Sequence, residues 1–221
     1  MEFISVVELV GTVAFAVSGA LVAIDKELDY YGITFFAIIT AVGGGIIRDI
    51  LIDERLPAAL ENPLYVLISI ASAAATIAFY RKIVPYTNIL QIFDAIGLAA
   101  FTAIGAEVAI QNSLNLPFVI VTLALLTGTG GGTLRDVFAK EIPFVFRKEI
   151  YAVASILGAV CFIIIGELSG NNTVALYSCF GITLLIRLGC MKKDVHLKKV
   201  DRAGKTEKAD TSAEIKKDIL K

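Results

Sequence analysis

Reactive side chains are scarce in this 221-residue sequence, which contains one histidine, three cysteines and no tryptophan. Cys161, Cys179 and Cys190 lie in or beside long apolar blocks without metal-ligand spacing, so we expect them to be small packing residues. His196 stands alone in a polar segment. The sequence shows no nucleophile–base–acid set and no phosphate-binding loop. We therefore expect no enzymatic activity, no catalytic residue, no metal site and no cofactor.

Charge is also scarce. Only 19% of the residues are charged and 57% are hydrophobic, whereas soluble domains average about a quarter charged and about half apolar. The mean hydropathy is +0.78. A net charge of −1 gives no reason to expect a nucleic-acid partner. The excess of apolar residues indicates lipid as the main partner.

The apolar residues are gathered in long blocks. A helix needs about 20 mostly apolar residues to cross about 30 Å of hydrocarbon. A large soluble bundle would give its helices a charged face, and these blocks have almost none. We therefore predict an all-α membrane protein whose backbone is satisfied within its helices. Seven blocks reach or approach the required length: Val6–Ile24, Tyr31–Ile52, Pro63–Tyr80, Ile89–Ala109, Leu116–Phe138, Ile150–Ile165 and Val174–Cys190.

The first block is expected to remain as a span, because Glu2 stands where a signal peptide would carry basic residues. The domain prediction follows from the blocks. Residues 1–190 form a seven-helix transmembrane domain, and residues 191–221 form a polar, lysine-rich tail. For that tail the sequence allows two alternatives, a short helix that starts near Thr211 or disorder.

The chain contains an internal repeat. Residues 8–24 match residues 94–110 at an offset of 86, and the opening acids Glu8 and Asp94 also correspond in charge. Eight pairs are identical: Gly11/Gly97, Ala14/Ala100, Phe15/Phe101, Gly19/Gly105, Ala20/Ala106, Val22/Val108, Ala23/Ala109 and Ile24/Ile110. The sequence Gly-Gly-Gly-x-x-Arg-Asp then occurs at residues 43–49 and again at residues 130–136.

The repeat predicts the architecture. Each copy contains three spans, at about residues 6–80 and 89–165, and residues 174–190 form an additional seventh span. Because three is odd, the second copy starts on the opposite side of the membrane. The two copies are therefore expected to be inverted about an axis in the membrane plane, as in many transporters.

Basic residues predict the orientation. The loops after spans 1, 3 and 5 carry six basic residues outside the repeated motif: Lys26, Arg81, Lys82, Lys140, Arg147 and Lys148. The loop after span 2 carries only Arg55. The positive-inside tendency therefore predicts a cytoplasmic C-terminus and an external N-terminus, in the cell membrane. Five tyrosines near span ends are expected to form aromatic belts: Tyr30, Tyr31, Tyr65, Tyr80 and Tyr151.

The two glycine triplets have two interpretations. One glycine costs about 1 kcal/mol in a helix relative to alanine, and three in succession weaken it further. A kinked or unwound helix would expose carbonyls and N–H groups at mid-membrane. Alternatively, small residues let two helices pack closely, as we expect for Gly11, Gly19, Gly97 and Gly105. We favour a break, and thus a pore hinge, at Gly43, Gly44, Gly45, Gly130, Gly131 and Gly132.

The charged residues that follow each triplet are candidates for a pore. Charges within spans are costly and usually mark a pathway. Alternatively, each pair has already reached the interface and is simply solvated. The pore-lining or gating candidates are Arg48, Asp49, Arg135, Asp136, Thr129 and Thr133, with Thr40, Thr122 and Thr127 as further hydroxyls. The acids Glu8, Asp94 and Glu107 are either part of this route or ordinary interfacial caps.

The duplicated three-span unit, the two Gly-Gly-Gly-x-x-Arg-Asp motifs and the seventh span resemble the prokaryotic trimeric intracellular cation (TRIC) channels. Their repeat is also known as a glycine transporter domain. The resemblance covers roughly Val6–Cys190. It implies a homotrimer with one pore inside each subunit, between kinked spans 2 and 5, that conducts monovalent cations and chiefly potassium. The basic phosphoinositide-binding element of the animal members has no clear equivalent here.

We therefore expect a cation channel. The rival hypothesis is an alternating-access carrier for a small amino acid such as glycine, because inverted repeats with broken helices suit both functions. A carrier of zwitterions needs an ammonium site and a carboxylate site at one depth, whereas the two Arg-Asp pairs are expected on opposite sides of the breaks. This difference favours the channel. A non-transporting scaffold would leave the duplicated motif unexplained.

Overall fold

The computed structural model describes residues 6–52, 56–83, 88–147 and 150–193, and within these ranges the chain is helical without strands. The predicted tail lies outside the described residues. Seven of the helices are long and apolar enough to cross a membrane, which agrees with the seven predicted blocks. The helices are α1 (Val6–Asp25), α2 (Tyr30–Leu51), α3 (Ala58–Glu61), α4 (Leu64–Ile83), α5 (Ile89–Gln111), α6 (Pro117–Phe138), α7 (Phe144–Arg147), α8 (Ile150–Ser169) and α9 (Asn172–Lys193).

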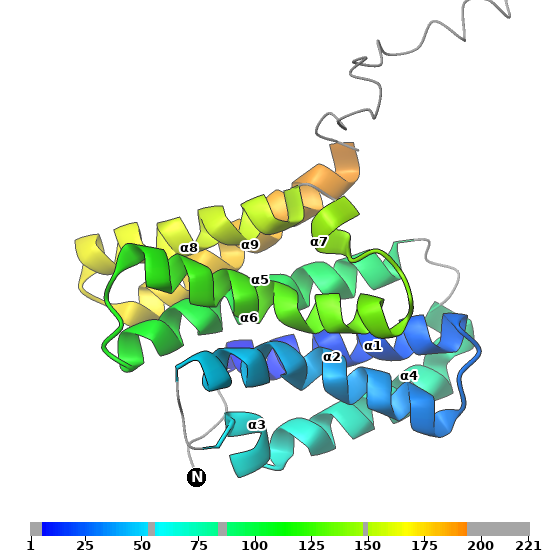
Figure 1. The fold of residues 1–221 in the computed structure, drawn as a ribbon. Helices are drawn as coiled ribbons and strands as arrows, with labels where there is room; N and C mark the ends of the chain where they lie inside the picture. The colour runs from blue at the N-terminus through cyan, green and yellow to red at the C-terminus, as the bar shows by residue number, and fades with distance from the viewer. Residues whose placement is uncertain (1–5, 53–55, 84–87, 148–149, 194–221) are drawn as a thin grey trace, which may run out of the picture.

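The helices form two similar groups. In each group three long helices pack against one another, α1 with α2 and α4, and α5 with α6 and α8. The short helices α3 and α7 occupy matching places, and Figure 1 shows them at opposite ends of the bundle. This is the arrangement expected of inverted copies. The match extends to a turn: Glu27 after α1 and Ser113 after α5, 86 residues apart, both have a positive φ, 56° and 59°.

The two groups meet through their central helices. α1 packs on α5 and α2 packs on α6, while α9 packs outside the second group on α8 and α5. α1 and α5 are the most deeply buried spans. Their small residues allow this, because a Cβ atom on Gly105 would lie 2.7 Å from the Leu123 carbonyl oxygen of α6. The close-packing role expected for Gly105 is therefore confirmed, and Gly19 has the same relation to Phe36 of α2.

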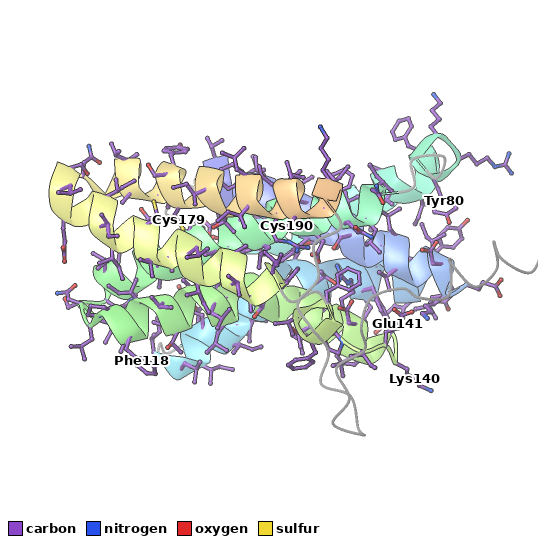
Figure 2. The ribbon with its side chains drawn as sticks, turned by 90° about the horizontal axis from the view of Figure 1, so that it is seen from above. Tyr80, Phe118, Lys140, Glu141, Cys179 and Cys190 are labelled. Carbon is purple, nitrogen blue, oxygen red and sulfur yellow. The ribbon has the colours of Figure 1, made fainter. Side chains whose placement is uncertain are left out.

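The outer helices carry an apolar surface. Exposed side chains such as Leu67 of α4, Leu157 of α8 and Leu185 of α9 are suited to lipid, which demands no polar partners. Figure 2 shows the ends of the bundle, with Phe118 at one end and Lys140 and Glu141 at the other. The bundle thus has an apolar flank, as a membrane-spanning protein requires.

Candidate functional site

The glycine triplets lie where α2 and α6 cross, and the predicted helix break is wrong. α2 remains α-helical through Gly43–Gly45, and α6 through Gly130–Gly132. A break inside lipid would leave backbone groups without partners, at a cost of several kcal/mol for each group. This exceeds the cost of about 1 kcal/mol for each helical glycine, so the continuous helix is the more stable form. The predicted kink in these two helices stays a prediction.

The triplets serve instead as a contact between backbones. A Cβ atom on Gly44 would overlap the Thr127 carbonyl oxygen, and one on Gly131 would overlap the Thr40 carbonyl oxygen. A Cβ atom on Gly130 would lie 3.0 Å from the Cα atom of Gly44. The alternative interpretation, close helix–helix packing, therefore holds at these positions.

The third glycine of each triplet has a different role, since it faces charged side chains. A Cβ atom on Gly45 would meet nothing closer than the Arg48 Nη2 atom, at 3.8 Å. A Cβ atom on Gly132 would lie 3.0 Å from the Tyr151 hydroxyl and 3.3 Å from Asp94 Oδ1. Each triplet thus joins the central helix contact to a cluster of charged residues, one cluster in each repeat.

The first-repeat cluster consists of Glu8, Arg48, Asp49 and Tyr65. Arg48 Nε donates to Asp49 Oδ1 at 2.7 Å, and the Tyr65 hydroxyl donates to Glu8 Oε1 at 2.6 Å. Asp49 Oδ2 accepts the Ala58 backbone N–H at 2.9 Å, at the start of α3. Arg48 and Asp49 are 5% and 1% exposed. The alternative that this pair is simply solvated at the interface is therefore wrong.

The second-repeat cluster consists of Asp94, Arg135, Asp136 and Tyr151. Arg135 donates to Asp136 Oδ1 from Nε at 2.8 Å and to Asp94 Oδ1 from Nη1 at 2.9 Å. The same Nη1 atom lies 2.9 Å from the Ser18 hydroxyl of α1. Arg135 and Asp94 have no exposed surface. A buried guanidinium is stable here because two carboxylates and a hydroxyl surround it.

The two clusters have the same construction. Asp136 Oδ2 accepts the Phe144 N–H at the start of α7 at 2.9 Å, as Asp49 accepts the Ala58 N–H at the start of α3. Each motif aspartate therefore neutralises its arginine and also caps a short helix. Negative charge at a helix N-terminus is favourable, because the first N–H groups of a helix lack internal partners.

The clusters differ in access. A small cavity of about 20 Å³ opens on the first-repeat cluster, which is space for about one water molecule or a small ion. It is lined by Glu8, Ala41, Val42, Gly45, Arg48, Asp49, Ala58, Ala59, Tyr65 and Phe101. The second-repeat cluster is sealed, since Asp94 and Tyr151 are buried where their counterparts Glu8 and Tyr65 are partly exposed, and Arg135 has no exposed surface.

A pair of aromatic rings packs beside the glycine contact. Phe15 of α1 stacks on Phe101 of α5 with ring centroids 5.3 Å apart. Phe101 also lines the cavity of the first-repeat cluster, and a Cβ atom on Gly131 would lie 3.3 Å from the Phe15 ring. Because the two phenylalanines are an identical pair of the repeat, the stack joins equivalent positions of the two copies.

The threonine hydroxyls bond within their own helices. Thr129 donates to the Leu125 carbonyl at 2.7 Å, and Thr133 donates to the Thr129 carbonyl at 2.8 Å. Thr40, Thr122 and Thr127 bond in the same way, each to the carbonyl four residues earlier. The structure places Arg48 and Asp49 at the cavity and Arg135 and Asp136 in the sealed cluster. The five threonine hydroxyls do not line the cavity.

Several residues of the clusters were missed as site residues from sequence. Tyr151 was expected in an aromatic belt, which is wrong because it is 1% exposed within the second-repeat cluster. For Asp94 the sequence allows either an interfacial cap or a place in the route, and the structure shows that it accepts a hydrogen bond from Arg135. The repeat offers a sequence signal for these cluster members, because Glu8 matches Asp94 and Tyr65 matches Tyr151 at the repeat offset. Among the described residues, no three His, Cys, Asp or Glu side chains are grouped as metal ligands.

Both repeats match a known protein family. The model of a family described as glycine transporter matches twice, over residues 5–81 and 91–167. The chain belongs to this family. The two matches also support the predicted duplication, since each covers one group of three long helices. Residues 172–193 of α9 lie outside both matches.

The chain is also similar to membrane proteins of several bacteria. The UPF0126 membrane protein YvgT of Bacillus subtilis is 39% identical over 81% of this chain and 88% of its own length. The UPF0126 inner membrane protein YadS of Escherichia coli is 37% identical over 69% of this chain and 74% of its own length. With seven spans, the present chain is a multi-pass integral membrane protein.

Solved structures match over nearly their whole length. One is the TRIC trimeric intracellular cation channel orthologue from Rhodobacter sphaeroides, with 34% sequence identity and a TM-score of 0.80 over 86% of this chain and 97% of that chain. A prokaryotic TRIC channel in 0.5 M KCl matches with the same identity and TM-score over 96% of its length. The resemblance to TRIC channels is therefore confirmed in fold.

Proposed function

We propose that this protein is a cation channel with a pore inside each subunit, beside the crossing of α2 and α6. The observation that carries the proposal is the match to solved trimeric cation channels over 97% of a channel chain. The two charged clusters at opposite ends of α2 and α6 support it, because charges inside spans usually mark an ion pathway. Monovalent cations, chiefly potassium, are the proposed permeant ions.

The proposed route begins at the cavity of the first-repeat cluster. Glu8 and Asp49 place two carboxylates there beside one arginine, and this excess of negative charge attracts cations. The route continues past the Phe15–Phe101 stack to the second-repeat cluster. An apolar constriction resists entry of hydrated ions, and at the far end Asp94 and Asp136 hold Arg135 in buried ion pairs.

The route is closed in this conformation. The backbones of α2 and α6 touch at Gly44 and Gly131, and Arg135 is tied to Asp94, Asp136 and Ser18. Opening requires α2 and α6 to separate or to slide along the glycine contact, with rearrangement of the Arg135 bonds. The six triplet glycines are thereby proposed as the contact that separates on opening, and Arg48, Asp49, Arg135 and Asp136 keep their proposed pore and gating roles. Thr129 and Thr133 serve as helix-internal donors.

The assembly and orientation are part of the proposal. We expect a homotrimer, as described for the solved TRIC orthologue, in the cell membrane with the C-terminus in the cytoplasm. Lys26, Lys82 and Lys140 support this orientation, because they lie after the ends of α1, α4 and α6 or at those ends. Those three ends share one side of the bundle. An enzymatic role has no support in the site, whose charged groups are bonded to one another.

A carrier of glycine is the second candidate, because the family is described as glycine transporter. Each cluster does hold an arginine and carboxylates at one depth, as a zwitterion site needs. In the first-repeat cluster, however, Arg48 and Asp49 bond each other at 2.7 Å. A cavity of about 20 Å³ is also too small for an amino acid, since it has space for about one water molecule. These two observations favour the channel.

Recording the purified protein in a planar bilayer under a potassium gradient separates the candidates. Unitary currents that reverse at the potassium equilibrium potential are expected. Replacing potassium by a large organic cation should abolish them. Silent bilayers, together with saturable glycine uptake into liposomes made from the same preparation, would establish the carrier and overturn the channel.

A further inference from the structure

The seventh span makes the two clusters unequal. α9 packs on α8 and α5, and the repeat provides no counterpart of α9 beside α4 and α1. α9 brings Arg187 to the second group, where the side chain is 3% exposed. A buried arginine inside an apolar helix is costly and needs a compensating role.

Arg187 lies against the second-repeat cluster through Tyr151. Its Cζ atom is 4.7 Å from the centroid of the Tyr151 ring. The hydroxyl of Tyr151 lies beside Gly132 of α6, where Asp94 and Arg135 are also close to that glycine. Tyr151 is thus held between the guanidinium of Arg187 and the ion pairs of Arg135. A guanidinium over an aromatic face is attractive, and more so where water is excluded.

The charges of the two clusters differ as a result. The first-repeat cluster has one arginine and two carboxylates, Glu8 and Asp49. The second, with Arg187 included, has two arginines and two carboxylates. The end that opens to the cavity therefore has a net negative charge, and the sealed end, with Arg187 included, is neutral.

The polar groups around Tyr151 lie close together. A Cβ atom on Gly132 would lie 3.0 Å from the Tyr151 hydroxyl and 3.3 Å from Asp94 Oδ1, and the hydroxyl interacts with the Asp94 carboxylate. A movement of Tyr151 would therefore change its contacts with both Asp94 and Arg187.

A plainer role for Arg187 is to extend along α9 to the interface, since Lys192 and the end of the helix lie close by. That role predicts an exposed guanidinium. The side chain is instead buried and stacked on Tyr151. Its position therefore fits a contact within the protein.

We propose that Arg187 is a positioning residue of the gate at the second-repeat cluster. By holding Tyr151 against Asp94 and Arg135 it stabilises the closed state, and its charge makes cation entry from this end less favourable than from the other. The proposal rests on the channel function. It gives the seventh span, which lies outside the repeat, two roles. The span helps to close the route at the second-repeat cluster, and it makes conduction asymmetric.

The test uses single-channel recording of the full chain with Arg187→Met, which preserves bulk but removes the charge and the stacking group. We expect the ratio of open to closed time to rise about 30-fold, the scale of one desolvated cation–π contact. We also expect the current–voltage relation to become more symmetric. The control is Lys192→Met, an exposed residue of the same helix, which should leave both properties unchanged.

An unchanged open ratio and unchanged rectification in Arg187→Met, with the same elution on a sizing column, would overturn the proposal. If Arg187→Met fails to fold, Arg187→Lys decides, because lysine retains the charge but lacks the planar group that stacks on Tyr151. A rise in its open ratio supports the proposal and a parental ratio overturns it. A parent protein that is silent under all conditions contradicts the channel function itself, which distinguishes that failure from a failure of this inference.

Discussion

Gly44 of α2 and Gly131 of α6 meet backbone to backbone. A Cβ atom on Gly44 would lie 3.2 Å from the Gly131 nitrogen and would overlap the Thr127 carbonyl oxygen. Without side chains at this point, two antiparallel helices touch at the centre of the bundle. The contact stands between the open cavity and the sealed cluster, so in the proposed channel its separation is the simplest motion that would open a route.

Alanine scanning of one triplet tests this contact. Gly44→Ala should destabilise the protein by about 1–3 kcal/mol, because the methyl group is forced against a backbone carbonyl. Gly45→Ala is the matched control, since its Cβ atom would meet nothing closer than Arg48 Nη2 at 3.8 Å and alanine improves helix propensity by about 1 kcal/mol. Thermal melting in detergent should give a lower midpoint for Gly44→Ala and an equal or higher midpoint for Gly45→Ala. Equal midpoints would mean that the triplet is not a packing surface.

Removal of one partner from the buried ion pairs of the second-repeat cluster should strongly destabilise the protein, because it leaves a buried charge without full compensation. Asp94→Asn removes one of the two carboxylates that face Arg135, and loss of one partner of a buried pair costs about 3–5 kcal/mol. The control is Glu141→Gln, which breaks the exposed pair with Lys26 and should cost at most about 1 kcal/mol. Thermal melting measures both. Similar shifts of the melting midpoint in the two variants would contradict the predicted contribution of Asp94 to the buried ion pairs.

The Phe15–Phe101 stack is predicted to resist ion passage. Phe101→Ala should lengthen open times in bilayer recordings, because a smaller side chain lets water cross the constriction. It should also destabilise the protein by about 3–5 kcal/mol through lost packing. Phe118→Ala, at an 81% exposed position, should change neither property. Parental gating in a folded Phe101→Ala protein would exclude the stack as a barrier.

The carboxylate of Glu8 should concentrate cations at the cavity. Glu8→Gln is expected to reduce potassium conductance at low salt, with the difference vanishing near 1 M salt, where the Debye length falls to about 3 Å. Glu61→Gln is the control, because Glu61 is an exposed acid on α3 at the same end of the bundle. The salt series of unitary conductance decides. Equal losses in both variants would reduce the role of Glu8 to a general surface charge.

Part of the site was predictable from the repeat. Both Arg-Asp pairs were identified as candidates, and both are buried at the ends of the central helices. The pairing of Glu8 with Asp94 and of Tyr65 with Tyr151 across the repeat marked the remaining cluster members, although their contacts were not inferred. Arg187 had no such signal, because it lies outside the repeat in a helix with no second copy to compare.

The sequence alone determined the class and the plan of this protein. Hydropathy and repetition are read along the chain, so they predict seven spans, two copies and a central duplicated motif without reference to distant residues. Tertiary structure decided what the motif does. A helix break and a close helix contact both call for glycine, and only the partner across the contact distinguishes them. Since the Thr127 and Thr40 carbonyls lie where side chains would be, and since lipid penalises an unpaired backbone, the triplets that first suggested hinges are continuous helices in contact.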